Sequence, residues 1–265
     1  MFRPSEGNWY LLRSTAGFAA QNWGISTDKL VPADYDDDGK ADVAVFRADV
    51  NEANPDFYIL NSSNGTVRGV SWGIPGDLPV VGDYDGDGAA DVAVYRPSNN
   101  TWYIIRTTRG FISATFGSAG DTPVVMDPDG DNTSNIGVFR PGNNTWYIAN
   151  TLIDPAHSFA AIPWGQAGDN LVPADYDGDN KDDIAVFRPS NGVWYIRQSS
   201  NGALAAIQFG ANGDVPVPGD YDADGRDDQA VYRGGTWYLN RSLAGFAAAG
   251  FGVASDTAVP KAYIP

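Results

Sequence analysis

Short runs of alternating apolar and polar residues recur along the chain, and turns rich in Gly, Pro, Asn or Asp separate them. Residues 92–96 (Val-Ala-Val-Tyr-Arg) and 101–106 (Thr-Trp-Tyr-Ile-Ile-Arg) follow the alternation of β-strands, and the segment 97–100 between them has the composition of a turn. Pro79–Gly82 precedes this pair of segments and Phe111–Phe116 follows it. The pattern predicts four consecutive antiparallel strands, here called a, b, c and d.

This four-strand unit repeats along the whole chain. A first marker is an aromatic-Gly pair with an Asp five residues after the aromatic, and the steps between these Asp residues are 49, 44, 48, 45 and 42 residues. An aromatic-Arg pair and an aromatic-Tyr pair recur with it, and all eight Trp residues lie on the three markers. Four short strands per repeat of this length predict a blade of a β-propeller.

The two ends of the chain lie at complementary points of the repeat. Residues 1–24 begin inside strand b and run through strands c and d, whereas Ala258 to Tyr263 align with strand a. We therefore expect an all-β, six-bladed β-propeller with four-stranded antiparallel blades, which forms a single domain over residues 1–265. Its composite closing blade is expected to combine residues 1–24 and 256–265, because ring closure removes the open sheet edges that promote aggregation.

An acidic loop of the form D-x-D-x-D-G-x-x-D lies between strands a and b in five repeats, and we number its positions 1 to 9. Positions 1, 3, 5 and 9 are Asp34, Asp36, Asp38 and Asp42; Asp83, Asp85, Asp87 and Asp91; Asp127, Asp129, Asp131 and Asn135; Asp175, Asp177, Asp179 and Asp183; and Asp220, Asp222, Asp224 and Asp228. The third loop therefore has one carboxylate fewer than the other four.

The acidic loops have the residue types of a calcium site, because Ca²⁺ prefers six to eight hard oxygen ligands in a flexible geometry. Position 6 needs a left-handed backbone, which suits Gly39, Gly88, Asn132, Asn180 and Gly225. Position 7 is expected to offer its backbone carbonyl, and the residues there are Lys40, Ala89, Thr133, Lys181 and Arg226. We expect about five Ca²⁺ ions, each bound in the weak extracellular range of roughly 10⁻⁴–10⁻³ M. The alternative is a set of solvated turns, which the mutual repulsion of the crowded carboxylates disfavours.

The sequence of these loops and of the strands after them resembles a known family. The segment Asp-Tyr-Asp-Gly-Asp-Gly at 83–88, followed by Ala-Val-Tyr-Arg-Pro-Ser-Asn at 93–99 and Thr-Trp-Tyr at 101–103, looks like the FG-GAP/VCBS repeats of bacterial secreted and surface proteins. The acidic loop is similar to that of integrin α-subunit propellers. The resemblance departs from the pattern at Asn135 and in the closing blade, where Ala262 stands at loop position 1. It implies a calcium-binding propeller in an extracellular or cell-surface setting.

The remaining distinctive residues are best explained by the fold. We expect the Arg and Asp of the markers to form structural ion pairs, with a ring that receives an anionic ligand as the alternative. The Trp residues are expected in the core between blades, and the alternative is a platform that stacks on sugars. The only histidine, His157, is expected in a solvated turn.

Composition narrows the range of partners. The chain has 33 Asp and Glu against 17 Lys and Arg, a net charge of −16, which disfavours nucleic acid. It has no apolar stretch long enough to span a membrane. No signal peptide is evident, so we expect a monomeric domain of a larger protein that is secreted or on the surface of a bacterial cell.

No catalytic triad, phosphate-binding glycine loop or zinc pattern appears, so we expect no enzymatic activity. The expected function is a calcium-binding extracellular interaction, adhesion or scaffolding module whose partner is a protein or glycan at the cell surface. Exposed turn residues such as Asn99, Asn100, Asn143 and Asn144 are candidates for that contact. The alternatives are a lectin with repeated interblade sugar pockets, or an accessory domain of a secreted polysaccharide-processing enzyme.

Overall fold

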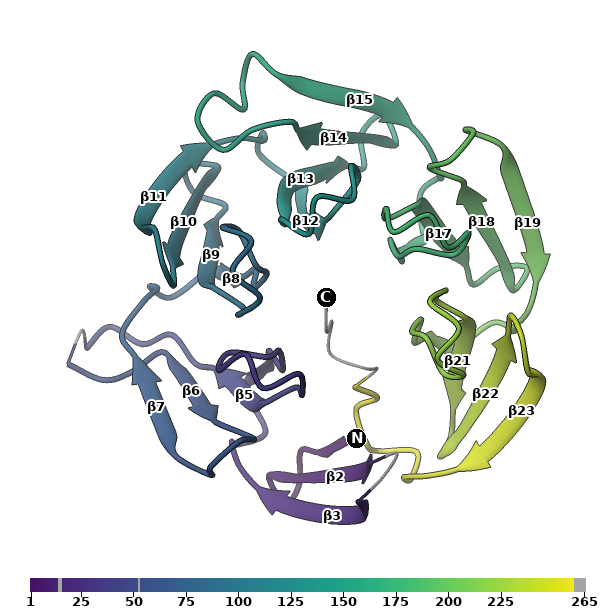
Figure 1. Ribbon diagram of the computed structural model, residues 1–265, viewed down its shortest axis with the longest axis horizontal. Helices are drawn as coiled ribbons and strands as arrows, with labels where there is room; N and C mark the ends of the chain where they lie inside the picture. Colours follow the sequence, from purple (N-terminus) through teal and green to yellow (C-terminus); the bar gives the residue numbers. More distant parts are fainter. Residues whose placement is uncertain (14–15, 52, 260–265) are drawn as a thin grey trace. The chain divides into compact units, whose positions relative to one another are not determined.

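The computed structural model describes residues 1–13, 16–51 and 53–259, and every regular element in these residues is a β-strand (Figure 1). The strands form six antiparallel sheets, five of four strands and one of three. The fold class is an all-β six-bladed β-propeller with four-stranded antiparallel blades, as predicted. None of the described residues belongs to a helix long and apolar enough to cross a membrane. The chain divides into two compact units, which are described one at a time.

One unit comprises Thr27–Asp127 and Asp131–Trp164 and contains three blades. Strands a to d are neighbours in chain order in every blade. The fourth strands, β7, β11 and β15, lie on the same outer side of this unit (Figure 1). The strands are β4 (Lys29–Leu30), β5 (Val43–Phe46), β6 (Phe57–Leu60), β7 (Val67–Val70), β8 (Leu78–Pro79), β9 (Val92–Arg96), β10 (Thr101–Arg106), β11 (Gly110–Thr115), β12 (Thr122–Met126), β13 (Asn135–Arg140), β14 (Thr145–Ala149) and β15 (Phe159–Pro163).

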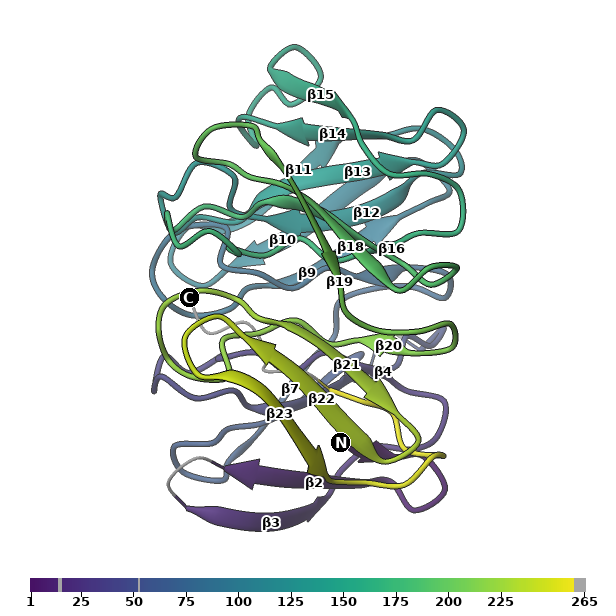
Figure 2. The ribbon, with the colours of Figure 1, turned by 90° about the vertical axis from the view of Figure 1, so that its right-hand side faces the viewer.

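The other unit comprises Met1–Ser26, Pro128–Gly130 and Gly165–Lys261, and its described residues contain two four-stranded blades and the three-stranded sheet. Figure 2 shows β22 and β23 of this unit side by side with opposite directions, as in the antiparallel pairing of Thr236–Arg241 with Gly245–Gly250. The strands are β1 (Phe2–Arg3), β2 (Asn8–Arg13), β3 (Gly17–Asn22), β16 (Asn170–Leu171), β17 (Ile184–Arg188), β18 (Val193–Arg197), β19 (Leu204–Gln208), β20 (Val215–Pro216), β21 (Gln229–Arg233), β22 (Thr236–Arg241) and β23 (Gly245–Gly250).

The three-stranded sheet is completed by the C-terminal part of the chain. Phe2 and Thr257 form an antiparallel bridge, in which each backbone N–H donates to the other carbonyl at 2.9 and 2.7 Å. Arg3 and Asp256 form an ion pair beside this bridge. The two ends of the chain are therefore paired, as predicted, but the bridge is formed by Thr257, one residue before the predicted strand Ala258–Tyr263. Ala258 and Val259 are not in a strand, and residues 260–263 lie outside the described residues.

Strand b is the buried centre of each complete blade. The residues of β9 from Val92 to Tyr95 are all buried, and their two faces serve different cores. Val92 and Val94 pack in a cluster with residues of the preceding blade, whereas Ala93 and Tyr95 pack in a cluster with residues of the following blade. Because a strand presents alternate residues to opposite faces, an uninterrupted apolar run fills two interblade cores.

In the second blade, strand a is shorter than the sequence predicted. The expected segment Pro79–Gly82 contains only the last residue of β8, after which Val80 donates to the carbonyl of Ala93 and Gly82 forms an isolated bridge with Asp91. The ladder is thus interrupted at Val81. The predicted strands b and c match β9 and β10, and strand d matches β11 within one residue at each end.

The Trp residues of strand c are core residues. Trp9, Trp102, Trp146 and Trp194 are at most 2% exposed. Each indole N–H donates to the backbone carbonyl of the marker aromatic that ends the same blade, as in the bond from Trp102 to Phe116. Buried indoles whose N–H groups are bonded within the protein cannot stack on a sugar, so the core interpretation holds for these four residues.

Candidate metal sites

The acidic loops turn sharply because two of their residues have left-handed backbones. Position 6 has a positive φ in all five loops, between 62° and 93°, as the sequence predicted. Position 4 also has a positive φ, which the sequence analysis missed because Asp37 and Ala223 occupy it in the first and fifth loops. Left-handed residues at alternate positions reverse the chain within a few residues, which brings the intervening carboxylates together.

The carboxylate at position 1 holds the loop in this shape. In the second loop, Asp83 Oδ1 accepts hydrogen bonds from the backbone N–H groups of Asp85, Gly86 and Asp87, and its Oδ2 accepts one from Gly88. Asp34, Asp127, Asp175 and Asp220 each accept a bond from the position-6 N–H in the same way. Position 1 therefore stabilises the loop as well as carrying a charge.

Each acidic loop brings three carboxylates to one point. In four loops, one carboxylate oxygen from each of positions 1, 3 and 9 lies within 4.8 Å of the other two. The groups are Asp34, Asp36 and Asp42; Asp83, Asp85 and Asp91; Asp175, Asp177 and Asp183; and Asp220, Asp222 and Asp228. The third loop instead combines positions 1, 3 and 5, which are Asp127, Asp129 and Asp131. Five acidic triads of the described residues could thus hold metal ions.

The carboxylate at position 3 has one buried oxygen without a hydrogen-bond partner in each of the four full loops. These atoms are the Oδ1 atoms of Asp36, Asp85, Asp177 and Asp222. A buried, unpaired carboxylate oxygen carries a large desolvation cost. Its recurrence at one position, within the triad, is the structural feature that a bound cation would explain.

In the four full loops, the carboxylate at position 5 is not one of the three whose oxygens lie within 4.8 Å of one another. Its carboxylate accepts a hydrogen bond from the backbone N–H of position 7, as in the bond from Ala89 to Asp87 at 3.0 Å. The same bond occurs in the other four loops, where the donors are Lys40, Thr133, Lys181 and Arg226. The role of the position-7 carbonyls as ligands stays a prediction.

Position 9 connects the acidic loop to two other backbone segments. Asp91 Oδ2 accepts from the N–H of Tyr84 at 2.8 Å, and its Oδ1 accepts from the N–H of Thr107 in the turn between strands c and d at 2.7 Å. Asp42, Asp183 and Asp228 make the corresponding bonds. In the third loop Asn135 instead donates its side-chain amide to the carbonyl of Ala149. This loop therefore has neither the charge nor the arrangement of the others at position 9.

Burial makes the charge of several of these carboxylates costly. It raises the pKa of Asp91 and of Asp183 to about 6, in each case against the opposing effect of backbone hydrogen bonds. The pKa values of Asp42, Asp175 and Asp228 are raised for the same reason. A cation among the carboxylates would offset this cost. The donor set consists of oxygens only, which suits a hard cation such as Ca²⁺ rather than zinc.

The second repeated feature is a bonded Arg in every blade. Arg3, Arg47, Arg96, Arg140, Arg188 and Arg233 pair with Asp256, Asp28, Asp77, Asp121, Asp169 and Asp214, respectively, through two hydrogen bonds each. The Asp side chains are at most 1% exposed. Each guanidinium also lies over the ring of the marker Tyr, as Arg96 does over Tyr103 at 4.4 Å. These contacts support the interpretation of the six Arg and Asp residues as structural ion pairs.

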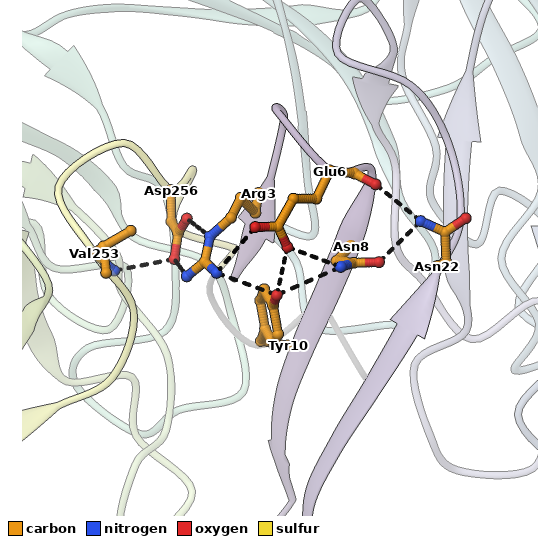
Figure 3. Close-up of polar contacts among 7 residues, drawn as sticks. All are labelled: Arg3, Glu6, Asn8, Tyr10, Asn22, Val253 and Asp256. Atoms are coloured by element: carbon orange, nitrogen blue, oxygen red, sulfur yellow. Dashed lines mark hydrogen bonds and ion pairs between the residues drawn. The ribbon is translucent and has the colours of Figure 1, made fainter.

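The composite blade shows this arrangement at the point where the chain ends meet (Figure 3). Arg3 donates to both carboxylate oxygens of Asp256, which also accepts from the N–H of Val253. The hydroxyl of Tyr10 donates to Glu6 at 2.7 Å, and Glu6 also approaches Arg3 at 3.6 Å. In the corresponding turns of other blades Asn99 and Asn143 stand in place of Glu6. The closing blade therefore has an additional ion pair, between Arg3 and Glu6.

The asparagines proposed as contact residues belong to the same turns between strands b and c. The side-chain amides of Asn99 and Asn143 donate to the hydroxyls of Tyr103 and Tyr147 at 2.9 and 3.0 Å. Asn100 and Asn144 have left-handed backbones with φ of 54° and 52°. These residues shape the turns, and their role in contact with a partner stays a prediction.

His157 lies on the surface, as predicted. Its ring Nδ1 donates a hydrogen bond to the carboxylate of Asp154 at 2.7 Å, and its side chain is 83% exposed. The bond to Asp154 raises the pKa of this imidazole.

Comparisons with known proteins agree on the fold. No family model matches the sequence, and no curated protein matches it. Among solved structures, the chain is similar to a lectin from Agrocybe aegerita that specifically recognises non-reducing terminal N-acetylglucosamine, with a TM-score of 0.58, 16% identity and coverage of 91% of this chain and 73% of the lectin.

Two further structures have the same level of likeness. Virginiamycin B lyase from Staphylococcus aureus has a TM-score of 0.57 and 10% identity over 95% of this chain and 80% of the lyase. PorZ, a bacterial surface component of the type-IX secretion system of Porphyromonas gingivalis, has a TM-score of 0.54 and 13% identity over 93% of this chain and 31% of its own. At such identities the likeness shows the fold alone. The protein is a six-bladed β-propeller with repeated acidic loops that could hold metal ions.

Proposed function

We propose that this protein is a calcium-binding propeller of the FG-GAP/VCBS type that acts outside a bacterial cell as an interaction module without catalytic activity. The observation that carries the proposal is the buried, unpartnered Oδ1 at position 3, which recurs in four loops beside two further carboxylates. Ca²⁺ satisfies such oxygens and offsets their mutual repulsion. Millimolar calcium outside cells would fill weak sites of this kind.

Removal of calcium tests the proposal that the acidic loops bind Ca²⁺. Binding to the folded state alone stabilises it by mass action, so the melting temperature should rise with Ca²⁺ and fall when a chelator is added. The increase should exceed that produced by equal Mg²⁺, because Mg²⁺ requires stricter octahedral geometry. A melting temperature that is the same with Ca²⁺, with Mg²⁺ and with chelator would contradict the proposal.

The absence of catalysis is part of the proposal and has its own test. The distinctive residues of this chain recur in every blade, whereas an active site normally breaks the symmetry of a repeat. Turnover of a polysaccharide that is abolished by a point substitution outside the acidic loops would overturn it.

A lectin is the second candidate function. The Agrocybe aegerita structure binds a terminal sugar on the same fold. In addition, strand d of each blade has an exposed apolar residue at its first or second position. Aromatic faces suit the apolar faces of sugars. These residues are Phe18, Val67, Phe111, Phe159, Leu204 and Phe246, with exposures between 43% and 65%.

A glycan array distinguishes the two candidates. A lectin should bind one class of terminal sugar, and F18A, F111A and F246A together should weaken that binding at least tenfold through lost stacking and avidity. Val50, which is 89% exposed in a turn between strands b and c, offers the control V50A. If the protein binds no glycan on the array, the lectin function is excluded and a protein partner remains. Pull-down from cell-surface extracts would then identify that partner.

A further inference from the structure

The turn between strands c and d lies against the acidic loop of its own blade in the four full loops. The first residue of this turn donates its backbone N–H to Oδ1 of position 9 at 2.6–2.7 Å. The donors are Ser62, Thr107, Ser199 and Ser242. Although the bonded residues of turn and loop are 14 to 20 positions apart in the sequence, the two segments form one polar cluster.

The second residue of the turn contacts position 3. The hydroxyl of Ser63 donates to Asp36 Oδ2 at 2.5 Å, and the hydroxyl of Ser200 donates to Asp177 Oδ2 at 2.6 Å. Thr108 donates both its hydroxyl and its backbone N–H to Asp85 Oδ2, at 2.8 and 3.1 Å. In each case the other oxygen of the same carboxylate is the buried Oδ1 without a partner.

The fifth loop supplies a natural comparison. Leu243 occupies the second position of its turn, so no hydroxyl is available there. The backbone N–H groups of Leu243 and Ala244 donate to Asp222 Oδ2 at 3.1 and 2.7 Å instead. Oδ2 of position 3 therefore accepts a hydrogen bond from the turn in all four full loops, but the donor is a side chain in only three of them.

We propose that Ser63, Thr108 and Ser200 are positioning residues for the metal ion, because each hydroxyl fixes one oxygen of position 3 and thereby directs the other toward the triad. The inference rests on the proposed calcium function and adds the turn between strands c and d to the site. These residues need not touch the ion. Their effect passes through the position-3 carboxylate.

The physical reason is the freedom of an aspartate side chain. Its terminal torsion is broad, so an unrestrained carboxylate samples many orientations and loses that freedom when it binds an ion. A hydrogen bond to a charged oxygen is stronger than one between neutral groups and selects one orientation in advance. Asp85 is the most restrained, since it is only 4% exposed and its Oδ2 also accepts from the N–H of Arg109.

The inference predicts an order among the sites. The second loop, with three donors on Asp85 Oδ2, should bind Ca²⁺ most tightly among the full loops. The fifth loop, with two backbone donors on Asp222 Oδ2, should follow. The first and fourth loops, with one hydroxyl donor each, should bind more weakly than the fifth. The third loop, with Asn135 at position 9, should be the weakest of the five.

The test compares the full chain carrying S63A, T108V and S200A with the wild type in calorimetric titrations of the metal-free proteins with Ca²⁺. Loss of one charge-assisted hydrogen bond should weaken binding roughly tenfold at three of the sites. The matched control carries S5A, S98A and S190A, three exposed serines in turns between strands b and c, and should titrate like the wild type. L243S should strengthen the fifth site, because its hydroxyl would add a third donor to Asp222 Oδ2.

A second measurement separates positioning from general damage to the fold. Terbium luminescence excited through the loop tyrosines Tyr35, Tyr84, Tyr176 and Tyr221 reports the four full loops, because the third loop has Pro128 at that position. T108V alone should weaken terbium binding and leave the metal-free melting temperature near that of the control, while T108S should restore binding. Titrations of the triple variant and T108V that match the wild type would overturn the inference and leave calcium binding intact. A wild-type chain that binds no Ca²⁺ would overturn both.

Discussion

At the scale of single residues, the Arg at the end of strand b combines two interactions. Its guanidinium forms two hydrogen bonds with a buried Asp and lies over a Tyr ring, as in the group Arg96, Asp77 and Tyr103. The Asp also accepts from a backbone N–H of its own turn, here that of Ile74. Loss of the carboxylate therefore leaves both a guanidinium and a turn N–H without their acceptor.

The first prediction concerns this group. Asp77→Ala should lower the free energy of unfolding by about 2 kcal/mol, because a largely buried Arg loses its charge partner. Denaturant unfolding followed by fluorescence measures the change. Asp154→Asn, in the exposed pair with His157, should leave the unfolding curve unchanged. Equal effects of the two substitutions would contradict the structural role of the buried pair.

The second prediction concerns pH and the metal-free protein. Burial raises the pKa of Asp91 and Asp183 to about 6, above the value of about 3.9 for an unfolded chain. Between these values the folded state holds more protons than the unfolded state, so the contribution of these groups to stability is largest in acid. It should decline as the pH rises from about 4 to about 6.

The measurement uses metal-free protein prepared on a chelating resin. The melts in acid then need no soluble chelator in the buffer. The variant with Asp91→Asn and Asp183→Asn lacks the titrating groups and should show a smaller decline in melting temperature over this range than the wild type. Saturating Ca²⁺ should reduce the decline in the wild type. Parallel pH profiles of wild type and variant would show that these two groups do not titrate as described.

At the scale of elements, the acidic loop was largely predictable and the turn opposite it was not. The spacing of the carboxylates predicted that positions 1, 3 and 5 converge and that position 9 closes the site, and in the four full loops the structure brings positions 1, 3 and 9 together. It also predicted the left-handed backbone at position 6. The left-handed backbone at position 4 could not be predicted, because Asp37 and Ala223, which occupy this position in two loops, do not indicate that conformation. The donors from Ser62, Thr107, Ser199 and Ser242 could not be inferred, because they depend on the register of strands b and c rather than on local spacing.

The third prediction uses the exceptional third loop. Asn135→Asp restores the carboxylate at position 9, but it also removes the amide that donates to the carbonyl of Ala149. The metal-free variant should therefore melt at a lower temperature than the wild type, and its stabilisation by Ca²⁺ should be larger. Thermal melts in both conditions measure the two effects. Asn135→Ala is the control, since it should lose the same hydrogen bond without any gain from calcium.

At the scale of the whole chain, repetition gives contacts that one blade alone cannot form. Within each unit, the carbonyl at position 1 of one acidic loop accepts from the N–H at position 8 of the next. These bonds join Asp34 to Ala90 and Asp83 to Ser134 in one unit, at 2.6 and 2.5 Å, and Asp175 to Asp227 in the other, at 2.6 Å. The sequence period predicted the blades, but contacts between blades require knowledge of how the sheets pack.

The fourth prediction concerns the joining of the two chain ends. Deletion of residues 257–265 removes the partner of Phe2 and leaves β1 as an open edge. The truncated protein should aggregate or lose its cooperative melting transition, which light scattering and calorimetry would show. Deletion of residues 264–265 alone keeps Thr257 and the predicted strand to Tyr263, so it should have little effect. A monomeric 257–265 deletion with an unchanged melting curve would show that the bridge is dispensable.

Calcium binding in the acidic loops can be tested directly by anomalous diffraction from crystals of the full chain grown with Ca²⁺. We expect one anomalous peak in each of the four full loops, among the carboxylates of positions 1, 3 and 9. It should lie roughly 2.3–2.6 Å from the position-3 Oδ1, the range of calcium–oxygen bonds. The third loop should show a weaker peak or none. Loops that hold only water at saturating Ca²⁺, with the position-3 Oδ1 hydrogen-bonded to that water, would show that these loops are not calcium sites.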